Sequence, residues 1–356
     1  MNLSKKNSII AICILAVIMS SAMIACKSKD AENQTEVTAQ IPDFEPLNDV
    51  VAGRPDVYLI VKLLDSDYWK VIINGARDSG NQNGVNVYYS GTSIETDWQG
   101  QSRLLDKALE QGADGIILAP NDSVKLSDQL RDIRSKGIPV ALVDTVVNDD
   151  VFDICYMTDN YIAGQNAAED MLIQLKSTGH DKNTSLSVGI LVGNSNSQTI
   201  SERLAGFYQY WSENAPSKWI ISSDIKNCNG DLEVAATMAQ ELLSANPNMA
   251  GMYGTNNGPT KVLCNTVMGS GRKDVVVVGF DYSDEMKAMI ASEEYVASTM
   301  LQCQYDMGFD AVVSVKSLTE GGVIKNKFED TGVVTAKYET MQTSDVMSIL
   351  KTYEVE

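Results

Sequence analysis

The segment that decides the fold is residues 112–145, GADGIILAPNDSVKLSDQLRDIRSKGIPVALVDT. Residues 115–119 form an apolar run without alternation, which is typical of a strand buried on both faces. Apolar residues with a helical period follow this run: Leu126, Leu130 and Ile133. Gly137 ends the predicted helix, and residues 139–143 predict a second buried strand. The segment is therefore predicted to be a strand–helix–strand unit with parallel strands.

Polar residues follow each of these two strands. The first strand runs into Pro120, Asn121 and Asp122, and the second runs into Asp144 and Thr145. Ligands of open parallel sheets bind beyond the carboxyl ends of the strands. Because both ends carry hydrogen-bonding groups, we expect a binding site at this edge of the sheet.

The first 25 residues have the pattern of an export signal. Two lysines precede an apolar stretch, residues 9–18, that is too short to span a membrane. The stretch ends in Met23-Ile24-Ala25-Cys26, which resembles the lipobox of bacterial lipoproteins. On that resemblance Cys26 is the lipidated first residue of an exported protein, anchored to the extracytoplasmic face of the membrane. The alternative is an ordinary signal peptide with an incidental cysteine.

Residues 26–54 are polar, contain Pro42 and Pro46, and show neither a helical nor a strand period. This composition predicts a disordered tether between the membrane and the folded part. The alternative is a structured arm.

The remaining chain, about 300 residues, is long enough for two domains of ordinary size. The formal charge of the whole sequence is −19, which argues against nucleic acid or an anionic lipid surface as a partner. The acidity favours a neutral or cationic small ligand. Four cysteines lie beyond the signal, without the spacing of metal ligands, and we expect buried free thiols: Cys155, Cys228, Cys264 and Cys303.

Strands alternate with helices from residue 57 to residue 143, and the pattern starts again near residue 154. This alternation predicts parallel sheets covered by helices on both faces. Two halves with one pattern predict an α/β fold of two doubly wound domains. A closed eight-stranded α/β barrel is the structural alternative.

Aromatic, carboxylate and amide side chains gather at the predicted strand ends. The candidate binding residues are Asp65, Tyr68, Trp69, Asp144, Asn194, Asn256, Phe280, Asp281 and Gln302. Carboxylate and amide oxygens accept hydrogen bonds from hydroxyl groups, and an aromatic ring covers the apolar face of a sugar. The set therefore predicts a sugar site, although Asp65 is also a candidate helix cap and Trp69 a candidate core residue.

Catalysis has little support in the sequence. No HExxH, GxSxG, P-loop or GxGxxG motif is present, and we expect no metal and no cofactor. Asp144 and Asp281 are conceivable as a glycosidase pair. They are predicted to project from two mobile domains, which suits binding better than chemistry that needs fixed geometry.

Several segments together resemble the type I periplasmic binding proteins that serve sugar ABC transporters, close to the ribose- and galactose-binding group. The matching segments are residues 65–69, 115–122, 138–144, 158–160, 202–207 (ERLAGF), 255–257, 277–281 (VVGFD) and Gln302. The likeness covers about residues 55–340. It implies two Rossmann-like lobes joined by a three-strand hinge, closing on a sugar. The implied N-terminal lobe is residues 55–157 plus 303–331, and the implied C-terminal lobe is residues 158–302 plus 332–350.

The resemblance also implies roles for single residues. Asp65, Tyr68 and Trp69 match ligand contacts of the first lobe, and Asp144 matches its carboxylate. Contacts of the second lobe and the hinge are matched by Asn256, Phe280, Asp281, Gln302 and, at a crossing strand, Thr158.

The chain departs from the ribose-binding pattern at two positions. Thr145 and Ser201 stand where ribose-binding proteins place arginines, and Arg203 is interpreted as more structural than ligand-binding. The departures suggest a different sugar, a polyol or a nucleoside-like ligand.

The leading hypothesis is a monomeric, lipid-anchored solute receptor that delivers a sugar or polyol to an ABC permease. One alternative is a receptor that passes its ligand-bound state to a chemoreceptor or a sensor kinase. Another is an exported hydrolase that uses Asp144 or Asp281. A transcription repressor with the same core is disfavoured by the export signal, the acidity and the lack of a basic helix-turn-helix segment.

Overall fold

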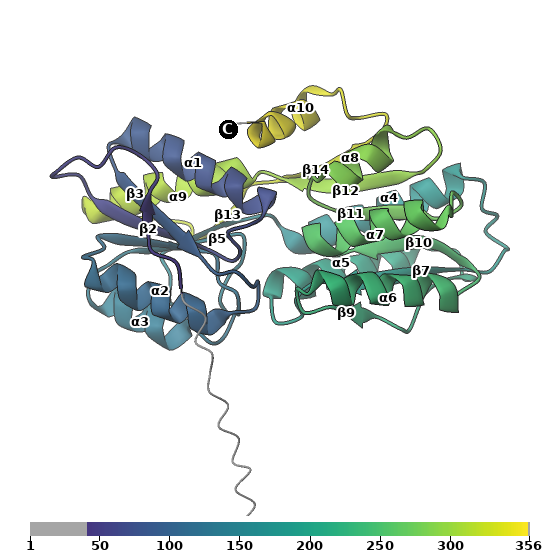
Figure 1. Cartoon of the computed structure of the whole chain (residues 1–356), viewed down its shortest axis with the longest axis horizontal. Coiled ribbons are helices and arrows are strands. Elements are labelled where there is room, and N and C mark those ends of the chain that lie inside the picture. Colours follow the sequence, from purple (N-terminus) through teal and green to yellow (C-terminus); the bar gives the residue numbers. More distant parts are fainter. Residues whose placement is uncertain (1–40, 355–356) are drawn as a thin grey trace, which may run out of the picture. The chain divides into compact units, whose positions relative to one another are not determined.

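The computed structural model describes residues 41–354, whose strands form two seven-stranded sheets (Figure 1). The predicted signal peptide, the lipidation site at Cys26 and the first part of the predicted tether lie outside the described residues. Each sheet has helices on both faces, so the two sheets and their helices define two lobes.

The N-terminal lobe is built on a sheet with the strand order β1-β3-β2-β4-β5-β6-β13. All pairings in it are parallel except the antiparallel pairing of β1 with β3. The strands are β1 (Glu45–Pro46), β2 (Asp56–Val61), β3 (Asn86–Gly91), β4 (Gly115–Leu118), β5 (Val140–Val143), β6 (Ile154–Met157) and β13 (Phe328–Asp330). Helices α1 (Asp67–Asn83) and α9 (Gln304–Thr319) cover one face, and α2 (Trp98–Glu110) and α3 (Ser127–Ser135) cover the other.

The C-terminal lobe repeats this plan, with the strand order β14-β12-β11-β10-β7-β8 and with β9 paired to β7. Its strands are β7 (Leu186–Val192), β8 (Trp219–Ile221), β9 (Lys226–Asn227), β10 (Met249–Gly254), β11 (Val276–Phe280), β12 (Ala297–Gln302) and β14 (Val333–Lys337). One face is covered by α4 (Asn160–Ser177) and α5 (Gln198–Asn214), the other by α6 (Leu232–Ala245), α7 (Asn257–Ser270) and α8 (Asp284–Ala291). Helix α10 (Ser344–Leu350) and a 3₁₀ turn (Lys351–Tyr353) follow β14.

Within residues 41–354 the chain passes from one sheet to the other three times, between β6 and α4, between β12 and α9, and between β13 and β14. This arrangement confirms the predicted α/β fold of two doubly wound lobes joined by three connections. The barrel alternative is wrong, because the strands form two open sheets.

Both lobes hold their paired helices together by close backbone contact. In the N-terminal lobe α1 and α9 approach so closely that a Cβ atom at Gly75 would lie 2.1 Å from the carbonyl oxygen of Tyr305. In the C-terminal lobe α4 and α5 do the same, since a Cβ atom at Gly164 would lie 2.2 Å from the carbonyl oxygen of Arg203. Any larger residue at either glycine would force the helices apart.

The prediction of a disordered tether over residues 26–54 is wrong for residues 41–54, which form an ordered arm. In this arm β1 pairs with the edge strand β3, with Glu45 opposite Tyr89. The amide of Asn48 bonds to β3 and the residue before it, donating to the carbonyl of Val85 at 2.8 Å and accepting from the N–H of Val87 at 3.0 Å. An open sheet edge supplies backbone partners that composition does not reveal.

Candidate functional site

A cavity of about 1000 Å³ lies between the carboxyl ends of the strands of the two lobes. The N-terminal lobe contributes residues from the loops after β2, β3 and β5, and the C-terminal lobe contributes residues from the loops after β7, β9, β10, β11 and β12. The polar residues that line it include Lys62, Asp65, Asp67, Tyr68, Glu95, Asp144, Asn194, Thr199, Arg203, Asn256, Asp281 and Gln302. The site predicted at the strand ends is therefore a single cavity with walls from both lobes.

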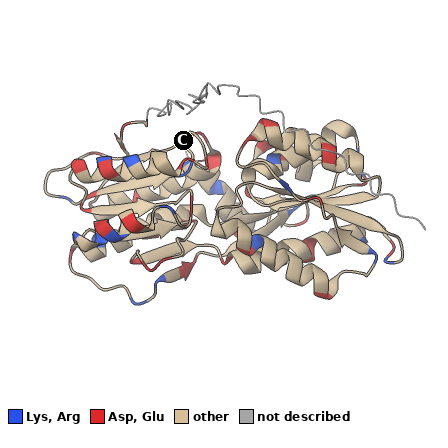
Figure 2. Cartoon of the chain, turned by 90° about the horizontal axis from the view of Figure 1, so that it is seen from below, with Lys and Arg blue, Asp and Glu red and all other residues tan. Residues whose placement is uncertain are grey.

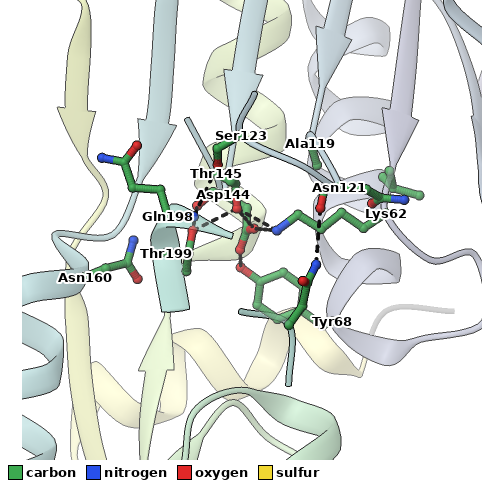
Figure 3. A network of polar contacts seen from close by, with 12 residues as sticks. Lys62, Tyr68, Ala119, Asn121, Ser123, Asp144, Thr145, Asn160, Gln198 and Thr199 are labelled. Atoms are coloured by element: carbon green, nitrogen blue, oxygen red, sulfur yellow. Dashed lines mark hydrogen bonds and ion pairs between the residues drawn. The ribbon is translucent and has the colours of Figure 1, made fainter. Parts of the chain in front are cut away.

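Asp144 stands directly after β5 in a left-handed backbone conformation, with φ of 65°. Its N–H donates to the carbonyl of Tyr156 on the neighbouring strand at 2.9 Å. The carboxylate accepts from Tyr68 Oη at 2.5 Å, from Lys62 Nζ at 2.7 Å and from Thr145 Oγ1 at 2.7 Å. Figure 3 shows Lys62 and Tyr68 converging on Asp144 from different elements. Such conformations in non-glycine residues concentrate at functional sites.

Lys62 is the charged partner of Asp144, and the sequence analysis missed it. Its ammonium group is buried, and Nζ also donates to Thr145 Oγ1 at 2.6 Å. Burial acts to raise the pKa of Asp144, but Lys62, Tyr68 and Thr145 outweigh it and hold this pKa below its ordinary value. The signal that was available is a lysine at the end of the apolar run of β2, where a buried charge needs a partner.

Asp281 repeats the backbone geometry of Asp144 in the C-terminal lobe. It follows β11 with φ of 68°, and its N–H donates to the carbonyl of Met300 on the neighbouring strand at 2.9 Å. Its carboxylate accepts from Gln302 Nε2 at 2.8 Å. Burial raises the pKa of Asp281 to about 7, against the opposing influence of Arg203 and Gln302.

Arg203, which the sequence analysis interprets as more structural than ligand-binding, both holds neighbouring elements together and lines the cavity. Its side chain is 1% exposed, with Nε donating to Asn160 Oδ1 at 2.9 Å and Nη1 to the carbonyl of Thr255 at 2.9 Å. Nη2 is buried without a hydrogen-bond partner among the described residues. A buried unpaired guanidinium nitrogen beside a cavity is a donor available to a ligand.

Most of the predicted binding residues meet at this cavity. Asp65, Tyr68, Trp69, Asp144, Asn194, Asn256, Asp281 and Gln302 all line it. The rings of Tyr68 and Trp69 meet edge to face, with centroids 4.8 Å apart. Asn256 stands at the beginning of α7, and its Oδ1 lies close to Gly193, where a Cβ atom would be 2.2 Å away.

Two predicted residues, Phe280 and Thr158, lie behind the cavity wall instead of on it. Phe280 is fully buried, and its ring lies under the guanidinium of Arg203, 3.8 Å from ring centroid to Cζ. Neighbouring residues of a strand point to opposite faces of the sheet. Phe280 therefore packs against the helices α4 and α5, while Asp281, the next residue, lines the cavity. Thr158 is also fully buried, and its hydroxyl donates to the carbonyl of Gly332 at 3.3 Å, across two of the connections between the lobes.

The two lobes touch directly beside the cavity. Thr199, near the start of α5, places Oγ1 2.8 Å from Thr145 Oγ1 and 3.1 Å from the carbonyl oxygen of Asp144. Asn194 Nδ2 donates to the carbonyl of Asn121 at 3.2 Å. Figure 3 shows Thr199 and Gln198 beside the residues that follow β4 and β5. These contacts bring the polar groups of both lobes within reach of one small molecule.

Charge over the rest of the molecule is mixed, with acidic and basic residues on helices and loops of both lobes (Figure 2). In the described part of the chain, no three histidine, cysteine, aspartate or glutamate side chains are placed to hold a metal ion. None of the helices between residues 41 and 354 combines the length and the apolar character needed to cross a membrane.

A family model described as "Periplasmic binding protein domain" matches residues 57–322. The chain therefore belongs to the periplasmic binding protein family, as the resemblance of its sequence motifs implied.

Three comparisons illustrate the relationship. A D-apiose import binding protein of Actinobacillus succinogenes is 23% identical over 273 residues, which are 77% of this chain and 84% of that protein. A carbohydrate transporter solute-binding protein of Agrobacterium radiobacter, solved with D-arabinose, has a TM-score of 0.78 at 23% identity over 84% of this chain and 99% of that one. The XylFII–LytSN complex has a TM-score of 0.71 at 25% identity over 80% of this chain and 98% of that one.

Replacing Lys62 tests the buried ion pair. Lys62→Met leaves Asp144 buried without its cation, and we expect a loss of about 3 kcal/mol in the free energy of unfolding. Adding Asp144→Asn to Lys62→Met should recover part of that loss, because the uncompensated charge is gone. Urea unfolding of both single variants and the double variant measures the coupling. Strictly additive losses would show that the two groups do not interact.

The raised pKa of Asp281 predicts a pH dependence of stability. Between pH 4 and pH 7 the folded ligand-free protein keeps a proton on Asp281 that the unfolded chain releases. This residue therefore stabilises the fold fully below pH 4, and its contribution is lost as the pH rises toward 7. Asp281→Asn should match the parent protein near pH 4 and exceed its stability at pH 8 by up to about 4 kcal/mol. A constant difference across this range in urea unfolding would contradict the assignment.

Proposed function

We propose that the chain is an extracytoplasmic solute-binding lipoprotein that captures a sugar or polyol between its two lobes and delivers it to an ABC permease. The observation that carries the proposal is the shared cavity, in which each lobe presents an aspartate at the end of a central strand. Membership of the periplasmic binding protein family supports it, and so do relatives named for apiose import and for carbohydrate transport.

The groups on the cavity wall suit a neutral, hydroxyl-rich molecule. Asp144, Asp281 and Gln302 offer oxygen acceptors, and Arg203 offers a donor without a partner. Tyr68 and Trp69 contribute aromatic surface of the kind that covers the apolar face of a sugar ring. The ligand would be held by both lobes at once, and the three connections would allow the lobes to open for its release.

The proposal assigns no chemistry to Asp144 and Asp281. Asp144 already accepts hydrogen bonds from Tyr68, Lys62 and Thr145, which hold it in place and suit a fixed acceptor better than a nucleophile. Recovery of an unchanged ligand after incubation with the protein tests this part of the proposal, and a hydrolysed ligand would refute it.

Anchoring through lipid on Cys26 belongs to the same proposal and rests on the export pattern of the first 25 residues. Mass spectrometry of the mature protein should find a diacylglyceryl group on Cys26 as the first residue. An unmodified mature chain that begins elsewhere would remove the anchor from the proposal.

A second candidate function is signalling, in which the ligand-bound lobes are recognised by a sensor protein instead of a permease. The likeness to XylFII, whose structure in complex with LytSN shows a protein of this fold bound to a protein partner, favours it. Pull-down with the ligand-loaded protein separates the two functions, because a permease would be recovered in one case and a receptor in the other.

Sugar binding is tested by calorimetry with a panel of monosaccharides and polyols after a thermal-shift screen. We expect one or a few members to bind, and Asp281→Ala to weaken binding at least about 100-fold, since it removes a buried acceptor from the ligand. Asp128→Ala is the matched control, because Asp128 is exposed on α3, pairs with Arg131 and does not line the cavity. Unchanged affinity of the Asp281→Ala variant would refute the assignment.

A further inference from the structure

Glu95 is a carboxylate of the cavity wall that the family resemblance does not assign. It lies in the loop between β3 and α2 of the N-terminal lobe and is partly buried. Its side chain faces Gly230 of the C-terminal lobe, where a Cβ atom would lie 3.5 Å from Glu95 Cβ and 3.9 Å from Oε2. Glu95 therefore lies where the loop after β3 approaches the loop after β9, at the boundary between the two lobes.

The loop that carries Glu95 is fixed on both sides. Thr92 Oγ1 lies 2.5 Å from the carbonyl oxygen of Lys62 and 2.8 Å from that of Ile94, and Asn121 Nδ2 donates to Thr92 Oγ1 at 3.1 Å. After Glu95, Asp97 caps α2 by accepting from the N–H of Gly100 at 2.8 Å. A carboxylate on a loop held in this way is positioned before any ligand arrives.

The carboxylate of Glu95 has no hydrogen bond or ion pair among residues 41–354, in contrast to the other buried acids of the cavity. Asp144 is bound by Lys62, and Asp281 is bound by Gln302. Burial raises the pKa of Glu95 and Asp144 adds to the rise, and together they outweigh the opposing influence of Lys62 and Arg203. The groups nearby therefore leave the negative charge of Glu95 incompletely compensated.

Two buried side-chain atoms of the C-terminal lobe, which forms the opposite wall of the cavity, also lack a hydrogen-bond partner among the described residues. Gln302 Oε1 and Arg203 Nη2 are buried without one in the described part of the molecule, although both side chains line the cavity. A ligand that fills the cavity would satisfy them. The cavity as a whole carries an excess of negative charge, because its six carboxylates face three cations, Lys62, Arg203 and Lys261.

We propose that Glu95 is a ligand-binding residue that makes the cavity selective for amino sugars over neutral and acidic sugars. The inference rests on the proposed function, because it names the class of sugar that the same cavity takes. A hydroxyl group could donate a hydrogen bond to Glu95 but would leave its charge in place. A protonated amine supplies both the hydrogen bond and the opposite charge. A carboxylate on the ligand would be repelled.

The test compares three forms of each sugar by calorimetry on the whole mature protein. The series are glucosamine, glucose and glucuronate, and the corresponding forms of galactose and mannose. One of the three sugars, glucose, galactose or mannose, should bind best. In its series we expect the amino sugar to bind about tenfold more tightly than the neutral sugar, and the acid to bind most weakly. Glu95→Gln, which keeps the size of the side chain, should bring the amino and neutral forms within about threefold.

Glu110→Gln is the matched control, because Glu110 is exposed at the end of α2 and does not line the cavity, and the preference for the amino sugar should survive it. Equal binding of amino and neutral sugars by the parent protein, or a preference that persists in Glu95→Gln, would overturn the inference while leaving sugar binding intact. Failure of all nine compounds and of the wider monosaccharide panel would instead refute the proposed function, and the inference with it. Thermal unfolding of Glu95→Gln should match the parent protein, which keeps a loss of preference separate from a loss of fold.

Discussion

The central constraint of this molecule is the left-handed backbone at Asp144 and Asp281. Each aspartate ends a central strand of its sheet, and each gives its N–H to a carbonyl of the neighbouring strand at 2.9 Å. A non-glycine residue adopts this conformation at a cost, so the packed sheet around it must hold it in place. Because both lobes have this conformation at the end of a central strand, each lobe places one carboxylate on the wall of the same cavity.

The two aspartates share their backbone geometry but differ in their electrostatic surroundings. Lys62 and Tyr68 compensate Asp144, so it stays ionised in the ligand-free protein. Asp281 has an amide as its bonded partner, and burial raises its pKa to about 7, so that about half of the ligand-free molecules carry a proton on it at pH 7. The N-terminal lobe therefore offers the ligand an ionised carboxylate, Asp144. The C-terminal lobe offers Asp281, whose charge can still change when a ligand binds. Because a ligand that donates a hydrogen bond to Asp281 favours its ionised form, we expect binding there to be linked to proton release.

The two-lobe α/β fold could be predicted from the sequence, because apolar runs that end in polar residues predict buried parallel strands. The same runs also predict the edge of each sheet at which a ligand binds. It placed Asp144 and Asp281 correctly at that edge for the same reason. It missed Lys62, because the partner of this lysine, Asp144, lies 82 residues away in the sequence. The partners that hold Arg203 at the cavity are also distant in sequence, 43 residues away for Asn160 and 52 for Thr255. It also put Phe280 on the wall, although strand alternation turns this ring toward the core, and it overlooked the pairing of residues 45 and 46 with an open sheet edge.

The most direct test of this account is a crystal structure of the protein with the sugar that binds most tightly. The account predicts that one molecule lies in the cavity and touches both lobes, with hydrogen bonds to Asp281 from one side and to the Asp144–Lys62 pair from the other. A ligand that contacts a single lobe, or that binds away from the ends of β5 and β11, would contradict it.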